Sequence, residues 1–298
     1  MLTRLRKYQA PAAIRLLLDV TASSTGGARR VTLRPHHGWQ PINLRELWEY
    51  RELLWILALR DIKVRYKQTV LGVAWAVIQP VCTMIVFTII GNLGNLSTGS
   101  TVKPLFYLCG LLPWQLFANA LNSAGNSLVG NQQLITKVYF PRLVIPTASI
   151  ITGLIDFAIG LVILLLMMAW YGQPIGPQLL LMPIFVALGF MASLGVGLWL
   201  SALNVEFRDV RYAIPFLAQL WLFCTPILYS STVITTPWQR VLIGLNPMSG
   251  VVEGFRWSVL GKPAPEAMLA VSVGVVMAML AGGLFYFRRM ERTFADRV

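Results

Sequence analysis

Residues 60–80, RDIKVRYKQTVLGVAWAVIQP, decide the fold of this chain because they join a cationic segment directly to an apolar one. The first eight residues contain four basic side chains, and no charged side chain occurs between Val70 and Val102. Lys and Arg remain in the anionic headgroup layer of a membrane, whereas a long apolar run replaces water with lipid tails. The stretch therefore predicts the point at which the chain enters a bilayer.

The composition extends this prediction to the whole chain. Of its 298 residues, 56% are hydrophobic and 12% are charged, which is about half the charge of an average soluble domain. Six apolar segments are each long enough to cross most of a hydrocarbon core about 30 Å thick. We therefore predict an all-α polytopic membrane protein with six transmembrane helices, at residues 70–91, 104–128, 143–170, 178–203, 212–230 and 266–287.

The positions of the basic residues predict the orientation of these helices. Of 25 Lys and Arg residues, 21 lie before residue 68, in the loops 129–142 and 204–211, or after Phe287, and four lie in the alternate loops. Because Lys and Arg are enriched in cytoplasmic loops, both termini are expected to be cytosolic. The charge sits at membrane edges and not on a basic helix, so the formal net charge of +13 does not indicate nucleic-acid binding.

Segments outside the spans have their own patterns. Residues 1–40 read as a basic cytosolic arm, and residues 291–298 as a cytosolic tail. Residues 43–59 form a predicted amphipathic helix that lies in the membrane interface, with Asn43 as N-cap, and the unit 41–67 adds the cationic stretch. Residues 231–265 contain two short apolar pieces, 238–245 and 250–260, and predict a re-entrant hairpin on the outer face or an ordinary external loop.

A polar stripe runs along the second predicted span. Its members follow one another at i, i+4, i+7, i+8 and i+11, and they are Gln115, Asn119, Asn122, Ser123 and Asn126. Amides are costly in lipid, so the stripe faces either a wet passage or other helices that accept its hydrogen bonds. Uncharged amides suit a hydroxyl-rich solute. Four aromatic residues are candidates for the same passage, with core or interface packing as the alternative: Trp75, Trp114, Phe117 and Trp221.

Catalytic and metal-binding patterns are missing from the sequence. It contains no GxxxxGK[ST] phosphate loop, no HExxH and no GxSxG, so we expect a protein that is not an enzyme and takes its energy from a partner or a gradient. Cys82, Cys109 and Cys224 lack metal-ligand spacing and are expected to be buried thiols. Asp156, in the third span, is either part of a proton relay or a hydrogen-bonded structural group.

Two predicted cytosolic loops combine apolar and charged side chains, as a docking surface for a soluble partner requires. The alternative is that they are only the charged ends of helices at the membrane boundary. The candidate docking residues are Gln132, Lys137, Tyr139, Phe140 and Arg142 in the first loop, and Glu206, Phe207, Arg208 and Asp209 in the second.

Five motifs, in this order and at these spacings, resemble the membrane-spanning subunit of ABC-2 type exporters that move polysaccharides such as O-antigen and teichoic acid. They cover residues 60–80 as quoted above, GLLPW (110–114), LITKVYFPR (134–142), LNVEFRDVR (203–211) and LNPMSGVVEGFRW (245–257). The resemblance extends over residues 40–290.

The resemblance implies a homodimer in the bacterial inner membrane with two separate ATP-binding cassette subunits, which hold ATP and Mg while this chain binds no cofactor. It makes residues 68–290 the transmembrane domain and the 43–59 helix a gate helix, and it implies that the two loops contact the ATPase. The implied cargo is a lipid-linked polysaccharide, whose pyrophosphate headgroup, or else anionic membrane lipid, would meet Arg60, Lys63, Arg65 and Lys67. Alternatives are an ABC-2 exporter of lipid or drug, and a polytopic enzyme acting on lipid-linked sugars.

Overall fold

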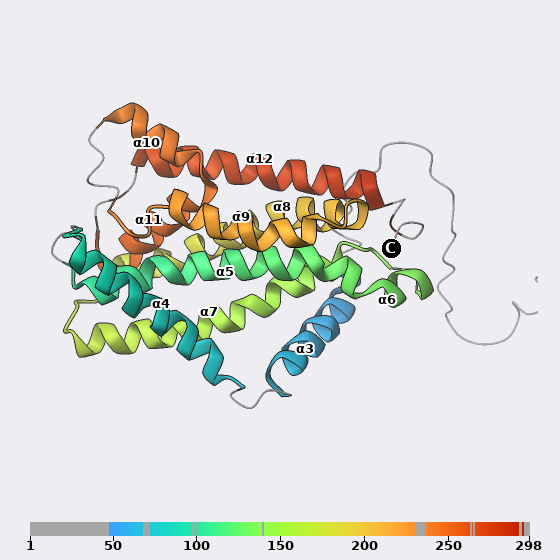
Figure 1. Cartoon of the computed structure of the whole chain (residues 1–298), viewed down its shortest axis with the longest axis horizontal. Coiled ribbons are helices and arrows are strands. Elements are labelled where there is room, and N and C mark those ends of the chain that lie inside the picture. The colour runs from blue at the N-terminus through green and yellow to red at the C-terminus, as the bar shows by residue number, and fades with distance from the viewer. Residues whose placement is uncertain are drawn as a thin grey trace, which may run out of the picture. The chain divides into compact units, whose positions relative to one another are not determined.

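The computed structural model describes residues 48–67, 72–96, 98, 101–138, 140–230, 236–262, 264, 266–291 and 294, and among these residues no strand occurs. The predicted basic arm and the first part of the predicted amphipathic helix lie outside the described residues. The helices, arranged as in Figure 1, are α3 (Arg51–Lys67), α4 (Ala74–Leu93), α5 (Lys103–Gly130), α6 (Gln132–Lys137), α7 (Val144–Trp170), the 3-10 helix η1 (Pro177–Leu181), α8 (Met182–Glu206), α9 (Val210–Cys224), α10 (Pro237–Gly244), α11 (Pro247–Leu260) and α12 (Glu266–Met290).

Five of the described helices are long and apolar enough to cross a membrane: α4, α5, α7, η1 with α8, and α12. They match five of the six predicted spans. The remaining predicted span, 212–230, corresponds to α9, which has 15 residues and ends at Cys224, short of the roughly 20 residues that a span needs. The helix ends there because Pro226 disfavours the α conformation at Thr225 and has no backbone N–H of its own.

The central helix of the bundle is α5. Of the most apolar stretch of 18 residues in α5, 78% are buried, whereas the corresponding stretches of the other four long helices are 22% to 39% buried. It packs against α4, α7, α8, α9 and α11, and Figure 1 shows it running between α7 and α9. Protein therefore surrounds α5 on most sides, and its polar side chains face other helices or a cavity instead of lipid.

A single helix, α3, runs through the predicted boundary at residue 59 and includes the cationic stretch up to Lys67. Leu57 and Ala58 are buried in a cluster with Leu128 at the end of α5 and Phe287 near the end of α12. Trp55, on the same helix, is exposed. The cluster fixes α3 at the end of the bundle where α5 ends, α6 lies and α7 begins (Figure 1).

The segment before α12 contains two helices, α10 and α11, joined at Leu245 and Asn246. They occupy the two short apolar pieces that the sequence predicts, and α11 packs against α5, α8 and α12. The prediction of buried thiols holds for Cys109 alone, because Cys82 and Cys224 are exposed. Both lie on helices whose outward sides carry apolar residues that no described helix covers.

Two glycines bring α8 and α12 into close contact. A Cβ on Gly283 would lie 2.3 Å from the carbonyl oxygen of Gly195, and a Cβ on Gly195 would lie 2.8 Å from the backbone nitrogen of Leu280. Because both obstacles are backbone atoms, a side chain at either position would push the helices apart. Small residues allow this kind of approach between helices in membranes.

We expect Gly283→Ala to lower the free energy of unfolding by roughly 1–3 kcal/mol, the usual cost of overpacking. The matched control is Gly274→Ala on the same helix, where nothing lies within 4 Å of an added Cβ, so that stability is unchanged or slightly raised by helix propensity. Unfolding in mixed micelles measures both variants. Equal stability of the two would contradict the close contact between α8 and α12.

Candidate functional site: a polar pocket at the end of α3

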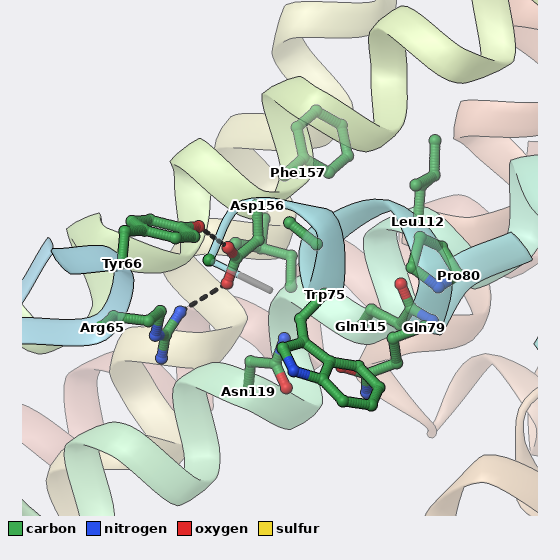
Figure 2. Close-up of a pocket in the computed structure, with 13 residues that line it drawn as sticks. Arg65, Tyr66, Trp75, Gln79, Pro80, Leu112, Gln115, Asn119, Asp156 and Phe157 are labelled. Atoms are coloured by element: carbon green, nitrogen blue, oxygen red, sulfur yellow. Dashed lines mark hydrogen bonds and ion pairs between the residues drawn. The ribbon is translucent and has the colours of Figure 1, made fainter. Parts of the chain in front are cut away.

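A pocket of about 320 Å³ lies where the end of α3 meets α4, α5 and α7 (Figure 2). Its walls come from α3, α4, α5 and α7, together with Gly72 just before α4. The lining residues are Arg65, Tyr66, Gly72, Trp75, Ala76, Gln79, Pro80, Leu112, Gln115, Leu116, Asn119, Asp156 and Phe157. The pocket therefore joins part of the cationic stretch to part of the polar stripe and to the acid of the third span.

The acid in the third span, Asp156, accepts hydrogen bonds from the Arg65 guanidinium and the Tyr66 hydroxyl (Figure 2). The Arg65 and Asp156 side chains are 36% and 20% exposed, and charge-assisted hydrogen bonds of this kind are stronger than neutral ones. Arg65 also places Nη2 3.5 Å from the Ser123 hydroxyl on α5. Asp156 is therefore neutralised by Arg65 of α3, a helix outside the long apolar ones. From the sequence, we considered partners of Asp156 only within the spans.

The Tyr66 phenol is held as a hydrogen-bond donor. Partial burial, followed in importance by the hydrogen bond to Asp156, raises the pKa of Tyr66 to about 12. The hydroxyl therefore keeps its proton at neutral pH, and Asp156 keeps two donors.

Amides and one indole form the other side of the pocket. Gln79 of α4 and Gln115 and Asn119 of α5 line it, and Figure 2 shows the Trp75 ring beside Asn119 and Gln115. Trp75 is 55% exposed, so a ring face remains available to a ligand. An indole surface next to amides offers apolar area together with neutral donors and acceptors.

Only part of the predicted polar stripe lines the pocket. Asn122 donates to the Ala118 carbonyl at 2.9 Å, within its own helix. Asn126 donates to the Asn122 carbonyl at 2.8 Å and accepts a hydrogen bond from Asn204 of α8 at 3.3 Å. Gln115 and Asn119 therefore line the pocket. Asn126 instead makes a hydrogen bond between helices, which is the alternative interpretation of the stripe.

Three of the four predicted aromatic residues lie away from the pocket. Trp114 and Phe117 are buried, and Phe117 packs edge-to-face against Trp221 of α9 with ring centroids 5.1 Å apart. Residues two positions apart on a helix differ by about 200° in direction, so Phe117 faces away from Gln115. If the helical positions of the aromatic residues on α5 had been compared with those of the amides, the aromatic residues would have been assigned to a different face of the helix.

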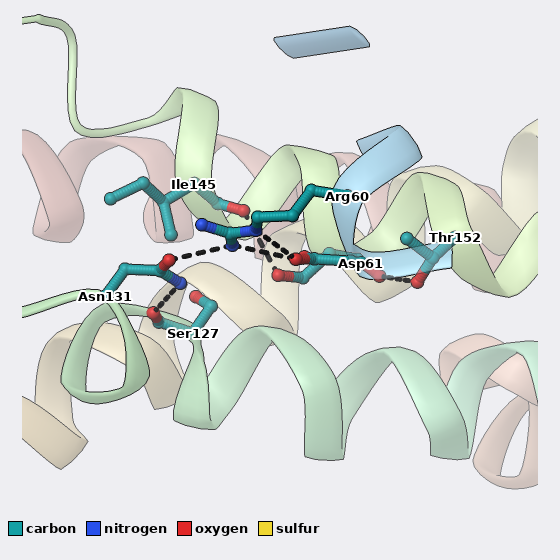
Figure 3. Close-up of polar contacts among 7 residues, drawn as sticks. Arg60, Asp61, Ser127, Asn131, Ile145 and Thr152 are labelled. Carbon is teal, nitrogen blue, oxygen red and sulfur yellow. Dashed lines mark hydrogen bonds and ion pairs between the residues drawn. The ribbon is translucent and has the colours of Figure 1, made fainter. Parts of the chain in front are cut away.

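Of the four basic candidates between residues 60 and 67, only Arg65 lines the pocket. Arg60 donates to Asn131 Oδ1 at 2.8 Å and to the neighbouring Asp61 at 2.7 Å, while Asn131 donates to the Ser127 carbonyl (Figure 3). Arg60 therefore ties α3 to the connection between α5 and α6. Lys63 and Lys67 are exposed.

The predicted docking residues divide into exposed and buried ones. Gln132 and Lys137 of α6 are exposed, as are Phe207, Arg208 and Asp209, and Glu206 is the last residue of α8. Phe140 instead belongs to the buried cluster around Leu57. Arg142 donates its backbone N–H to Glu291 beyond α12 at 3.1 Å, and Tyr139 lies outside the described residues.

We expect Arg65 and Asp156 to be energetically coupled. In a double-mutant cycle with Arg65→Gln and Asp156→Asn, we expect a coupling of about 1 kcal/mol or more, above the typical exposed pair and below a fully buried one. The measurement is the free energy of unfolding in mixed micelles. Lys63→Gln removes the same charge from the exposed side of α3 and should show no coupling to Asp156→Asn. Additive effects of Arg65→Gln and Asp156→Asn would contradict the ion pair.

Several known proteins are similar to this chain. The O-antigen export system permease protein RfbA of Myxococcus xanthus is 31% identical over 265 residues, covering 86% of this chain and 98% of that protein. A Klebsiella pneumoniae protein of the same name is 27% identical, covering 82% and 94%. The polysialic acid transport protein KpsM of Escherichia coli is 26% identical, covering 79% and 92%. Since residues 52–260 also match the family model for the ABC-2 type transporter, the chain belongs to this family of membrane transporters.

Proposed function

We propose that this chain is the membrane-spanning permease of an ATP-driven exporter that moves lipid-linked polysaccharide out of the cytosol across a bacterial inner membrane. Relatives that align over most of their length carry the names of O-antigen and polysialic acid transport proteins. The observation in the structure that carries the proposal is the pocket, in which neutral amides and an exposed indole surround a neutralised ion pair.

Each group in the pocket has a proposed task in passing a sugar chain. Gln115 and Asn119 exchange hydrogen bonds with hydroxyl groups without trapping a charge, and Trp75 presents an apolar face to the ring carbons. Asp156 keeps the Arg65 charge from standing alone at membrane depth, where an unpaired charge is costly. Arg65, with Lys63 and Lys67 on the same helix, would meet the phosphate groups of a lipid carrier or of membrane lipid.

The proposed assembly follows from the distribution of charge and of exposed apolar surface. We propose α9 as the sixth span, α3 as an interface helix, α10 and α11 as a re-entrant hairpin, and both termini in the cytosol. A second copy would cover the exposed apolar sides of α4 and α9, and two ATP-binding subunits would contact α6 and residues 204–211. Phe207, which is 55% exposed beside Arg208 and Asp209, supports docking there.

Export of a lipid or drug is less favoured, because a row of amides suits a hydroxylated solute better than an apolar one. An enzyme acting on lipid-linked sugars is also less favoured. Such an enzyme would use paired acids or a histidine cluster, and the acid in this pocket is bound to Arg65 and Tyr66.

Pocket variants test the passage. We expect Asn119→Trp to abolish export of surface polysaccharide because the indole fills the pocket, and Trp75→Ala to reduce it while Trp75→Phe retains most of it. The control is Trp170→Ala, a change at an exposed position at the end of α7, outside the pocket lining. Immunoblotting of surface polysaccharide, with membrane levels of each variant, measures the outcome. Normal export by a stably inserted Asn119→Trp protein would contradict the passage.

Docking of the ATPase is tested separately. We expect Phe207→Ala to reduce copurification of the ATP-binding subunit severalfold, since an exposed aromatic side chain is a typical interface anchor. Trp170→Ala is the control, because Trp170 is also an exposed aromatic residue (86%) but lies at the end of α7, away from residues 204–211 and not on the exposed sides of α4 and α9. Equal copurification of the Phe207→Ala variant and the unmodified protein would argue against contact at residues 204–211.

A further inference from the structure

Asn246 joins the end of α9 to the beginning of α11. Its Oδ1 accepts hydrogen bonds from the Met248 backbone N–H at 3.0 Å and from the Trp221 indole at 2.9 Å. Its Nδ2 donates to the Thr225 hydroxyl at 2.9 Å and to the Cys224 carbonyl at 3.2 Å. Helix ends leave backbone groups without partners, and this one amide supplies partners to both helices.

Arg256 of α11 holds the residues that follow. Its side chain is fully buried, and it donates to the carbonyls of Pro226 at 2.6 Å and Ile227 at 2.7 Å. Its charge is balanced by Glu253 at 2.8 Å. The planar guanidinium can reach two successive carbonyls together, whereas a lysine ammonium is a single compact charge on a flexible stem.

The same two residues connect α9 to the central helix α5. The Arg256 guanidinium carbon lies 3.7 Å from the centroid of the Phe106 ring, a cation–π contact. One turn along α5, a Cβ on Gly110 would lie 2.4 Å from Arg256 Nη2, so the guanidinium occupies space that only a glycine leaves open. Trp221, held by Asn246, packs against Phe117 of α5.

Along its length, α9 is held by few buried side chains. Only Ile214 and Ala218 are buried among its 15 residues. Its first residue follows the exposed connection at residues 207–209, and the carbonyl of its last residue accepts a hydrogen bond from Asn246. The hydrogen bonds of Asn246 therefore hold α9 at its carboxyl end, where they add to the few buried contacts along the helix.

We propose that Asn246 and Arg256, which we call the α9 clamp, are positioning residues that make the end of α9 and α11 move as one unit. A displacement of α9 that begins at the preceding connection, residues 207–209, would then reach the opposite end of the bundle, where α10 and α11 lie (Figure 1). This step rests on the proposed function, which places an ATP-binding subunit at residues 204–211. The clamp assigns a structural role to two residues of the motif at 245–257, a role that the hydropathy of this motif does not indicate.

Hydrogen–deuterium exchange in the purified complex tests the clamp directly. We expect Asn246→Ala and Arg256→Lys each to speed exchange of the amides at residues 222–230 by about tenfold or more, the effect of losing hydrogen bonds to an amide or a charged group. The matched control is Ser258→Ala, since Ser258 is buried on α11 and donates only to the Phe255 carbonyl of its own helix. Trp221→Phe removes the indole donor and part of the ring but leaves the other three hydrogen bonds of Asn246, so it serves where Asn246→Ala fails to fold.

Function supplies the second readout. We expect clamp variants to keep normal copurification of the ATP-binding subunit and normal ATP hydrolysis while export falls. We also expect the double variant Asn246→Ala with Trp221→Phe to export as much as Asn246→Ala alone. Three outcomes would each overturn the clamp. The first is unchanged exchange at residues 222–230, and the second is full export despite faster exchange. The third is loss of export that occurs only together with loss of the ATP-binding subunit. Failure of the unmodified complex to export polysaccharide would overturn the proposed function instead, while the exchange data would still decide whether α9 and α11 are joined.

Discussion

Helix α5 is polar along one side and surrounded by other helices, and a bilayer offers its amides no water to bind. Each polar group on this helix therefore needs a partner from the protein or from a cavity. Asn126 finds one on α8, Ser123 lies within reach of Arg65, and Gln115 and Asn119 face the pocket. The positions of α3, α7 and α8 around α5 follow in part from this requirement.

Charged groups at membrane depth need a partner even more than amides do, because an unpaired charge is costly there. Asp156 lies in a long apolar helix, and its neutralising partner comes from α3, whose other face is buried among Leu128 and Phe287. Arg60, less than two turns before Arg65, contacts Asn131 in the connection between α5 and α6. One helix thus touches both the connection to α6 and the pocket, and the two contacts are about 7.5 Å apart along its axis at the normal helical rise.

The sequence predicted the long helices well because a span is recognised from local composition alone. It placed the end of α9 too late, since hydropathy outweighed the local effect of Pro226 on Thr225. The helical spacing of the stripe included two of the amides that line the pocket, Gln115 and Asn119, but gave no sign of Gln79 on α4. Trp114 and Phe117 were grouped with the stripe by residue type, although their directions on the helix differ. The partner of Asp156 lies 91 residues away, and a pairing of that separation leaves no periodic signal.

The buried ion pair of α11 was missed for a related reason. Arg256 appeared as a basic residue of an outer loop, whereas the structure buries it completely beside Glu253, Phe106 and the carbonyls of Pro226 and Ile227. Counting charges by loop gives an orientation but does not distinguish a solvated arginine from one enclosed by helices. The separation of three residues from Glu253 to Arg256 on a helix was the available signal.

The short length of α9 has a consequence for the surrounding lipid. With α9 as the sixth span, its 15 residues measure about 22 Å at the normal helical rise, against a hydrocarbon thickness of about 30 Å. Such hydrophobic mismatch is relieved by local thinning of the bilayer or by protein that fills the remaining depth. Residues 225–227, which Asn246 and Arg256 hold by hydrogen bonds, would then fill part of the remaining depth. In that arrangement, the length of the lipid acyl chains would affect how well the membrane accommodates this end of the protein.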